Sequence, residues 1–388
     1  MIKPRLRQQL AELTAIPSIA CTMPEQDMSN VPVIETLANW FESAGFGCEI
    51  MPVAPGKANL IAVRAGTDPQ ARGGLVLAGH SDTVPFDQNL WHNDPFKMTE
   101  RDGKLYGLGM ADMKGFFALI LDAVANYAKT PFRAPLIVIA TCDEETSMAG
   151  ARALMEQSKG QGRFVLIGEP TNLKPARLHK GVMLERVVIT GKSGHSSDPE
   201  LGRNAIDAMH EVVNRLQQFR TSLKKIQQPL FPVPYPTLNL GCIHGGDNPN
   251  RICGLCELQF DVRPLPGMEI ENIRADIRHL LKGIEQQFGV SMLYEPATAG
   301  SGAAETPANS PFVQKIEGLL GETAGAVSFG TEAPYFRAQN MDTVILGPGN
   351  IEQAHQPDEY LEIKNISPML LLLNQLIHYY CVQGHAKI

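Results

Sequence analysis

The sequence lacks the long apolar runs that place a protein across a membrane. Its longest apolar stretches, such as PMLLLLNQLI (368–377), fall far short of the roughly 20 residues that span a bilayer. The N-terminal segment MIKPRLRQQLAELTAI has no apolar core of the kind found in secretory signals and is typical of an amphipathic helix. We therefore expect a cytoplasmic protein with no membrane partner.

Cysteine is scarce, and its spacing is irregular. The 7 cysteines do not form the pattern of a disulfide framework. Cys253 and Cys256 have CxxC spacing, but a zinc site would need a second pair and a thioredoxin-like site would open a helix. The motif lies in a strand-like run, where residues three apart face opposite sides of a sheet. We interpret both cysteines as incidental strand residues.

Runs of basic residues are also missing. The net charge of −7 favours solubility and argues against a nucleic-acid partner. The chain has no long internal repeat and no low-complexity tract, and 44% of its residues are hydrophobic, as in ordinary globular proteins. Its 388 residues exceed the usual size of a single hydrophobic core, which predicts about two domains.

Two patterns divide the chain. Residues 1–177 alternate strand-like apolar runs with helical patterns, for example the helix expected over 115–129. This alternation predicts an α/β fold with a mostly parallel sheet covered by helices. From residue 178 the order becomes βαββαβ, a ferredoxin-like arrangement, with helices expected over 203–220 and 271–289. Because the α/β pattern resumes near residue 296, we expect a catalytic domain of 1–177 and 296–388 with an inserted domain of 178–295.

Polar residues follow the predicted strands of the catalytic domain. Ligands gather beyond the carboxyl ends of strands in open α/β sheets, so these residues are expected to converge on one edge. The glycine-punctuated loop YGLGMADMKG adds one more acid, just before a helix. The convergent set contains two histidines and six acids: His80, His355, Asp82, Asp112, Asp143, Glu144, Glu145 and Glu169.

Any one of these residues taken alone is most simply a hydrogen-bonded surface histidine or a solvated acid. Together they are not, because uncompensated carboxylates crowded at one edge repel one another. No matching set of Lys or Arg occurs in these loops. A pair of divalent cations would compensate the charge, and mixed imidazole and carboxylate ligands suit zinc, with cobalt or manganese as substitutes.

Spacing suggests how two of these groups work. His80 and Asp82 lie two residues apart on an extended chain and face the same way, so the Asp82 carboxylate can accept a hydrogen bond from the imidazole and orient it. Glu144 and Glu145 are adjacent and point in different directions. One of the two can bind metal while the other acts as general base.

The motifs AGHSDTVP, LYGLGMADMKGFFA, TCDEETSMAGA, IGEPT and AHQPDEY, in this order, resemble the M20 family of metallo-aminoacylases and peptidases. The resemblance implies two zinc ions per subunit. It implies that His80 and Glu169 bind one ion, that Glu145 and His355 bind the other, and that Asp112 bridges them. It further implies that Asp82 orients His80, that Glu144 is the base, and that the Asp112–Met113 peptide is cis.

The inserted domain extends the resemblance through GHSSDP, IHGGDNPNRIC and DVRPLPGM. It implies a homodimer in which His195, Asn250 and Arg263 bind the substrate, although Arg263 could instead pair with Asp261 or Asp198. It also implies contact of Thr331 and Glu332 with the leaving group. The implied reaction is hydrolysis of a small N-acyl amino acid, N2-acetyl-L-ornithine, to L-ornithine and acetate in arginine biosynthesis. Alternatives are a succinyl-diaminopimelate or broader N-acyl-amino-acid hydrolase, and a non-catalytic metal-binding relative.

Overall fold

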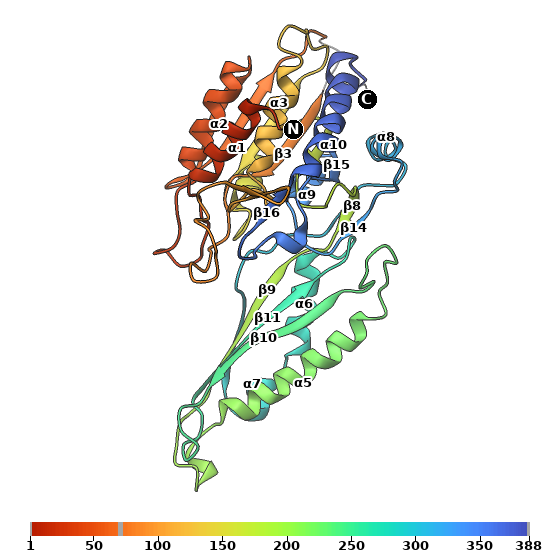
Figure 1. The fold of residues 1–388 in the computed structure, drawn as a ribbon. Helices are drawn as coiled ribbons and strands as arrows, with labels where there is room; N and C mark the ends of the chain where they lie inside the picture. Colours follow the sequence, from red (N-terminus) through yellow and green to blue (C-terminus); the bar gives the residue numbers. More distant parts are fainter. Residues whose placement is uncertain (1, 69–72, 386–388) are drawn as a thin grey trace. The chain divides into compact units, whose positions relative to one another are not determined.

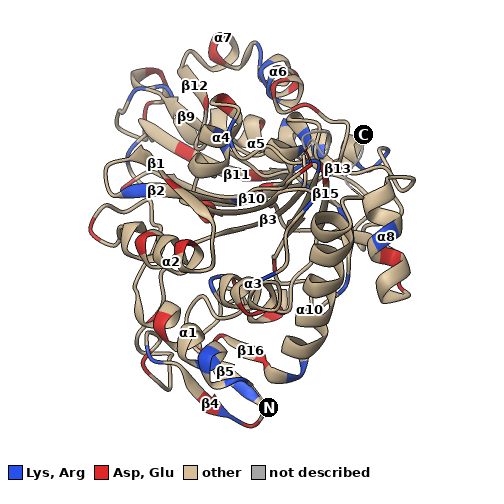
Figure 2. Cartoon of the chain, turned by 90° about the horizontal axis from the view of Figure 1, so that it is seen from above, with Lys and Arg blue, Asp and Glu red and all other residues tan. Residues whose placement is uncertain are grey.

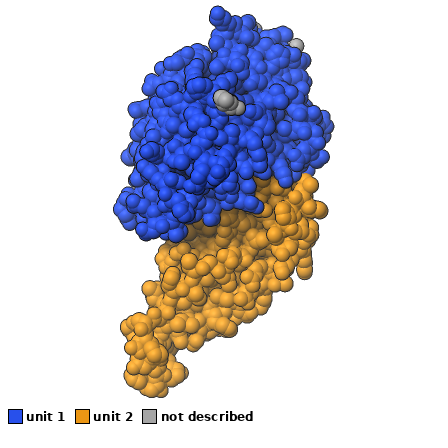
Figure 3. Space-filling view, viewed as in Figure 1, with its two compact units in different colours: residues 1–177, 305–325, 331–388 blue, residues 178–304, 326–330 orange. Residues whose placement is uncertain are grey.

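The computed structural model describes residues 2–68 and 73–385, which form two compact units (Figure 3). Unit 1 contains the residues up to Arg177, Glu305–Gly325 and the chain from Thr331 onward. Unit 2 contains Leu178–Ala304 and the short segment Ala326–Gly330. The inserted unit thus begins at the predicted residue but ends at Ala304 rather than at residue 295, and it includes a five-residue segment that the sequence did not suggest.

The main sheet is mixed, with a parallel centre, and most of it belongs to unit 1; β8, β13 and β14 each also include residues assigned to unit 2 (Figure 1). Its strands run in the order β1-β2-β6-β3-β7-β15-β8-β13, and β14 pairs with β8. The four central strands β6, β3, β7 and β15 are parallel, whereas β1 and β2 are antiparallel at one edge. Their bounds are β1 Gly47–Ala54, β2 Lys57–Arg64, β3 Leu75–His80, β6 Leu136–Thr141, β7 Phe164–Ile167, β8 Ala176–His179, β13 Ala304–Glu305, β14 Gly325–Val327 and β15 Asp342–Ile345.

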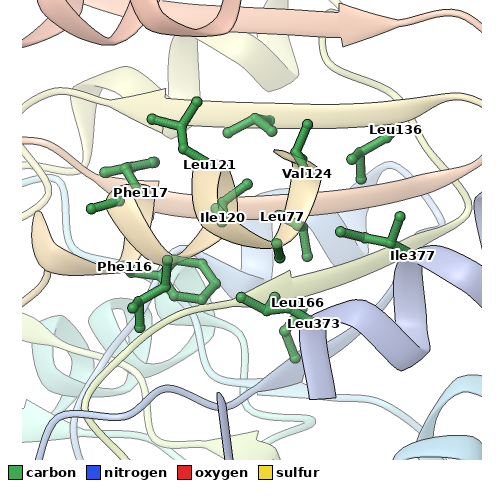
Figure 4. Packing of buried hydrophobic residues seen from close by; sticks show 14 of the residues in the cluster. Leu77, Phe116, Phe117, Ile120, Leu121, Val124, Leu136, Leu166, Leu373 and Ile377 are labelled. Atoms are coloured by element: carbon green, nitrogen blue, oxygen red, sulfur yellow. The ribbon is translucent and has the colours of Figure 1, made fainter. Parts of the chain in front are cut away.

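The helices of unit 1 cover this sheet. Leu75 and Leu77 of β3 share one apolar cluster with α1, α2, α3 and α10, as Figure 4 shows for Leu77 beside α3 and α10. Helices α4 and α9 have no residue in that cluster; they contact each other, and they contact β1 and β15 respectively. The bounds are α1 Pro4–Ala15, α2 Val31–Ser43, α3 Gly115–Ala125, α4 Ala149–Glu156, α8 Pro311–Leu320, α9 Ala333–Ala338 and α10 Ile363–Leu376, followed by a π turn at Ile377–Val382.

A small three-stranded sheet, which the sequence did not predict, connects two functional loops. It consists of β4 (Thr99–Arg101), β5 (Lys104–Tyr106) and β16 (Tyr360–Glu362) in the order β16-β5-β4. Tyr106 is the partner of Tyr360 in the antiparallel register. This pairing holds the loop that follows β5 next to the loop that precedes β16. The second loop begins after the 3₁₀ turn Ile351–Gln353.

Unit 2 is an antiparallel sheet with helices and a core of its own. The strands run in the order β10-β11-β9-β12, and the element order is the predicted βαββαβ. The second expected helix is divided into α6 and α7, because Gly283 between them has φ +85°. The bounds are β9 Met183–Thr190, β10 Thr237–Gly245, β11 Leu255–Arg263, β12 Ser291–Pro296, α5 Ala205–Leu223, α6 Ile270–Leu280, α7 Ile284–Phe288 and a 3₁₀ turn at Pro199–Leu201.

The two CxxC cysteines are free thiols in the core of unit 2. We expected them on opposite faces of a strand, but both belong to the same apolar cluster. The difference arises because β11 begins only at Leu255, so Cys253 lies before the strand and does not follow its alternation.

Candidate metal centre

His80 ends β3, a strand whose six residues are all buried between β6 and β7. Its Nδ1 lies 3.0 Å from the backbone carbonyl oxygen of Asp82. A carbonyl can only accept, so Nδ1 carries the hydrogen and the lone pair of a neutral ring lies on Nε2. Nε2 lies 3.0 Å from Oδ1 of Asp112. That contact is favourable only if a proton or a metal ion is shared between the two atoms, as in a metal-ligand pair.

The prediction that the Asp82 carboxylate accepts a hydrogen bond from the His80 imidazole is wrong. Its Oδ1 lies 4.0 Å from Nδ1 of His80, too far for a hydrogen bond. Because β3 ends at His80, the strand alternation on which the prediction relied does not reach residue 82. The backbone of Asp82 contacts the imidazole instead, and Oδ2 of its carboxylate accepts the backbone N–H of Glu145 at 3.1 Å. Burial raises the pKa of Asp82 to about 6.

Asp112 lies in the loop between β5 and α3, and the Asp112–Met113 peptide is cis, as the resemblance implied. The backbone around it is held by Glu359, a buried acid that the sequence analysis left out of the site. Oε1 of Glu359 accepts the N–H groups of Ala111 (2.7 Å) and Asp112 (3.1 Å), and Oε2 accepts that of Gly109 (3.0 Å). Burial and the nearby Asp112 carboxylate raise the pKa of Glu359 to about 8, and the three N–H groups oppose this rise.

His355 approaches from the loop before β16. Its Nε2 lies 3.0 Å from Oε2 of Glu145 and 3.7 Å from Oδ2 of Asp112. The hydrogen bond to Glu145 raises the pKa of His355 to about 9. His80, Asp112 and Glu145 each offer a ligand atom within 4.8 Å of the other two. Asp112 therefore presents one oxygen to His80 and the other to His355, which is the arrangement of a bridging ligand.

Glu169 and Glu144 complete the cluster of negative charge. Glu169 follows β7, is 4% exposed, and its Oε1 has no hydrogen-bond partner among the described residues. Burial and the Asp112 carboxylate raise its pKa well above the usual range. Burial and the Glu169 carboxylate do the same to the pKa of Glu144. Buried carboxylates at this density are stable only when neutralised, and divalent cations would neutralise them.

Asp143 does not belong to this cluster, contrary to expectation. Lys57 of β2, which is buried, places its Nζ 2.8 Å from Asp143 and 2.7 Å from Asp27. The lysine compensates Asp143, so of the three consecutive acids only Glu144 and Glu145 face the cluster. This lysine lies far from these acids in sequence, so the loops alone give no sign of it.

Glu332, for which the resemblance implied contact with the leaving group, is a fully buried acid. It precedes α9, is 0% exposed, and neither of its carboxylate oxygens has a hydrogen-bond partner among the described residues. Burial raises its pKa to about 7. Among the described residues, Oδ1 of Asp82 and Oε1 of Glu169 are also buried and unpartnered. The expected ligands offer imidazole nitrogens and carboxylate oxygens, a donor set that fits borderline divalent cations.

The predicted substrate-binding residues lie on unit 2. His195 and Asn250 are exposed neighbours: His195 bridges to Arg251, and the carbonyl of Asn250 accepts the N–H of Ser196 at 3.1 Å. Nδ1 of His195 lies 2.7 Å from the Ser197 hydroxyl. Arg263 is partly exposed and pairs with Asp261 at 2.9 Å, as the alternative interpretation held.

Comparison with known proteins gives consistent results. Residues 76–379 match the model of peptidase family M20/M25/M40. A curated relative, acetylornithine deacetylase of Proteus mirabilis, is 47% identical over 384 residues, with 97% of both chains covered.

Solved structures share the fold at low identity. Aminopeptidase PepT of Bacillus cereus has a TM-score of 0.76 at 19% identity, covering 96% of this chain and 97% of that one. A dinuclear metal binding peptidase of the M20 family from Bacillus subtilis has a TM-score of 0.69 at 16% identity, covering 99% and 98%. The predicted α/β class and family resemblance are thereby confirmed. The chain belongs to peptidase family M20/M25/M40.

Proposed function

We propose that the protein is a dimetal amidohydrolase that releases acetate from N2-acetyl-L-ornithine to give L-ornithine, a step of arginine biosynthesis. The observation that carries the proposal is the shared placement of Asp112 between His80 and His355, in a chain 47% identical to an acetylornithine deacetylase. Unit 1 would be the catalytic domain, and unit 2 the lid and dimerisation domain.

Two zinc ions per subunit suit the donor set, with cobalt as a substitute. His80 and Glu169 would hold one ion and Glu145 and His355 the other, with Asp112 bridging. When bound, such ions polarise a carbonyl and lower the pKa of water towards neutrality. The backbone carbonyl of Asp82 orients the ring of His80, and the carboxylate of Asp82 holds the backbone N–H of Glu145.

The protein's own groups would then move the protons. Glu144 takes a proton from the attacking water and returns it to the departing amine nitrogen, so that the amine leaves neutral. His195 donates a hydrogen bond to the oxyanion that develops on the acetyl carbonyl. The guanidinium of Arg263 and the amide of Asn250 hold the α-carboxylate of the substrate, for which a planar fork is well suited.

A homodimer in the cytoplasm is part of the proposal, with no nucleic-acid or membrane partner. Unit 2 exposes Ile206 of α5 and Ile243 of β10, 46% and 56% exposed, around a cavity that Met209 and Val213 also line. Contiguous exposed apolar residues support an interface with a second copy. Lys and Arg are interspersed with Asp and Glu (Figure 2), and no helix among the described residues is long and apolar enough to cross a membrane. Sedimentation of wild type and Ile243→Glu tests the interface.

A substrate panel tests the reaction. Turnover of N-acetylornithine, N-succinyl-diaminopimelate and N-acetylmethionine is measured after metal removal and after addition of zinc or cobalt. We expect metal-dependent turnover, highest for N-acetylornithine. Turnover of the succinyl compound alone would overturn the substrate, and absence of turnover with every metal would favour a non-catalytic relative.

A further inference from the structure

A cavity of about 230 Å³ lies beside the metal ligand His355, entirely within unit 1. Its walls come from three loops: the one that follows His80, the one that contains His355, and the one between β5 and α3, which contributes Leu108. Its lining residues are Val84, Pro85, Phe86, Asp87, Leu90, Trp91, Leu108, His355, Gln356 and Pro357. A group bound here would lie against a ligand of the proposed second ion, and so next to the reacting amide.

One residue pair joins the first two of these loops, and ring contacts order the first loop. Asp358 accepts the backbone N–H of His92 at 2.9 Å through Oδ1, and its Oδ2 lies 2.5 Å from Nδ1 of the same histidine. The ring of Phe86 packs edge-on against Trp91 and Phe96, at centroid distances of 6.4 and 5.4 Å. The cavity is therefore formed before any ligand arrives, as small-molecule sites usually are.

The lining has the chemistry of a site for an alkylammonium. Leucine, valine and proline side chains suit methylene groups, and the rings of Phe86 and Trp91 can face a cation. Asp87 is the one acid of the lining, and no Lys or Arg contributes to it. Oδ1 of Asp87 accepts the backbone N–H of Asn89 at 3.1 Å, which fixes the carboxylate group. The Asp87 carboxylate attracts an ammonium and repels a substrate carboxylate, whereas His355, a proposed ligand of the second ion, favours the opposite charge at its own wall of the cavity.

Size favours the same occupant. The single methyl of an acetyl group would leave most of the cavity empty. A chain of three methylenes and an ammonium has four times as many non-hydrogen atoms and would fill more of it. An amino-acid side chain of that length matches the cavity of about 230 Å³ better than the acyl group of the proposed reaction does.

We infer that this cavity binds the alkylammonium side chain of the substrate's amino acid, with Asp87 and Trp91 as its specificity-determining residues. The inference rests on the proposed function. It identifies the residues that would distinguish a cationic N-acetyl amino acid from a neutral one. Asp87 is exposed to solvent, which limits the contribution of its charge to that of a surface ion pair.

The test compares Asp87→Asn with a matched control in the same loop. Asp94 is also exposed and its Oδ1 accepts the backbone N–H two residues later, from Phe96 at 2.9 Å, but it does not line the cavity. The variant Asp94→Asn therefore reproduces the loss of charge and the change to the turn, without changing the lining. The substrates are N-acetyl-L-ornithine and N-acetyl-L-norleucine, in which a methyl group replaces the ammonium.

We expect Asp87→Asn to raise KM for N-acetylornithine about two- to fivefold, with kcat unchanged and with both constants for the norleucine compound unchanged. Asp94→Asn should change neither. An equal effect of Asp87→Asn on both substrates, or no effect, would overturn the inference. So would a Leu90→Trp variant that rejects N-butyrylornithine but not N-acetylornithine, since the cavity would then hold the acyl group. Wild-type turnover of N-acetylornithine tests the proposed function separately.

Discussion

Each unit of the protein buries one histidine that donates from Nδ1 to a backbone carbonyl, and the two histidines differ in everything else. His80 of unit 1 contacts the carbonyl of Asp82, and His179 of unit 2 contacts that of Lys180 at 2.8 Å. The pKa of His80 lies well above its usual range; burial lowers it, but Asp112, Glu144 and Glu169 raise it more. Burial alone dominates at His179, lowers its pKa to about 4, and leaves Nε2 without a partner among the described residues.

The difference between the units lies in how their buried acids are compensated. Glu185 of unit 2 is 0% exposed, and it accepts from Arg274 at 3.0 Å and from the Tyr294 hydroxyl at 2.8 Å. Glu169 and Glu332 of unit 1 are 4% and 0% exposed, and they have oxygens without a partner among the described residues. The same residue type is therefore paired in unit 2 and unpaired in unit 1, the unit that contains the candidate metal centre.

Removal of Glu144 is expected to have the largest effect on the centre of unit 1. We expect Glu144→Ala to lower kcat about 10³-fold or more, because the proposed base is lost. Zinc content should stay at the wild-type value, because Glu144 is not among the proposed ligands. Steady-state kinetics and metal analysis of the same preparation check this. Near-normal turnover would exclude Glu144 as the base, and Glu145→Ala, which should lose metal, is the contrasting variant.

The residues of the candidate centre could be proposed from the sequence because the ends of buried strands can be recognised in it. Buried runs such as 75–80 predict a strand from composition alone, and the topology of parallel strands then brings their ends to one edge. Glu359 was missed because an acid in a polar run such as HQPDEY is ordinarily solvated. Its role depends on the pairing of β5 with β16, two three-residue strands too short to give a pattern.

Compensation across long sequence separations was equally invisible. Lys57 neutralises Asp143 from another strand, and Arg274 neutralises Glu185 from the helix α6. Neither pair is visible in the local sequence. The loop sequences alone therefore put Asp143 among the uncompensated acids, and they do not show that Glu185 is paired. Glycine was more informative after the fact: Gly283, with φ +85°, explains why the helix expected over 271–289 is two helices.

Lowering the pH should act on unit 2 through His179. Its folded pKa of about 4 lies below the ordinary 6.5, so between these values the unfolded chain binds a proton that the folded one does not. Stability is therefore full above pH 6.5 and falls as the pH drops towards 4, by about 3 kcal/mol in all. Urea unfolding of wild type and His179→Gln at several pH values checks this. A variant with the wild-type pH dependence would show that His179 is not the group responsible.

His195 tests whether an exposed residue of unit 2 serves the centre in unit 1. We expect His195→Ala to lower kcat about a hundredfold, the typical loss for one oxyanion donor, with KM and melting temperature little changed. Its side chain contacts Ser197 at the surface, so little stability depends on it. His279→Ala, an exposed histidine on α6, is the control and should leave kcat unchanged. If both variants behave alike, unit 2 supplies no oxyanion donor from this position.

The smallest effect is expected from Glu359 of unit 1, which holds the backbone around Asp112 and is not itself a proposed metal ligand. Glu359→Gln keeps the size of the side chain, but one of its two terminal atoms becomes an NH₂ group that cannot accept. At least one of the N–H groups of Gly109, Ala111 and Asp112 then loses its acceptor.

Because these N–H groups belong to the loop that presents Asp112, we expect zinc affinity to fall about tenfold, as for other groups that orient metal ligands. Competition with a chromophoric chelator measures the affinity without relying on activity. Glu362→Gln, at the last residue of β16, is the control, since its carboxylate pairs with the exposed Lys364. Unchanged zinc affinity in Glu359→Gln would mean that the short sheet alone holds Asp112 in place, and that the buried acid serves only the fold, as Glu185 does in unit 2.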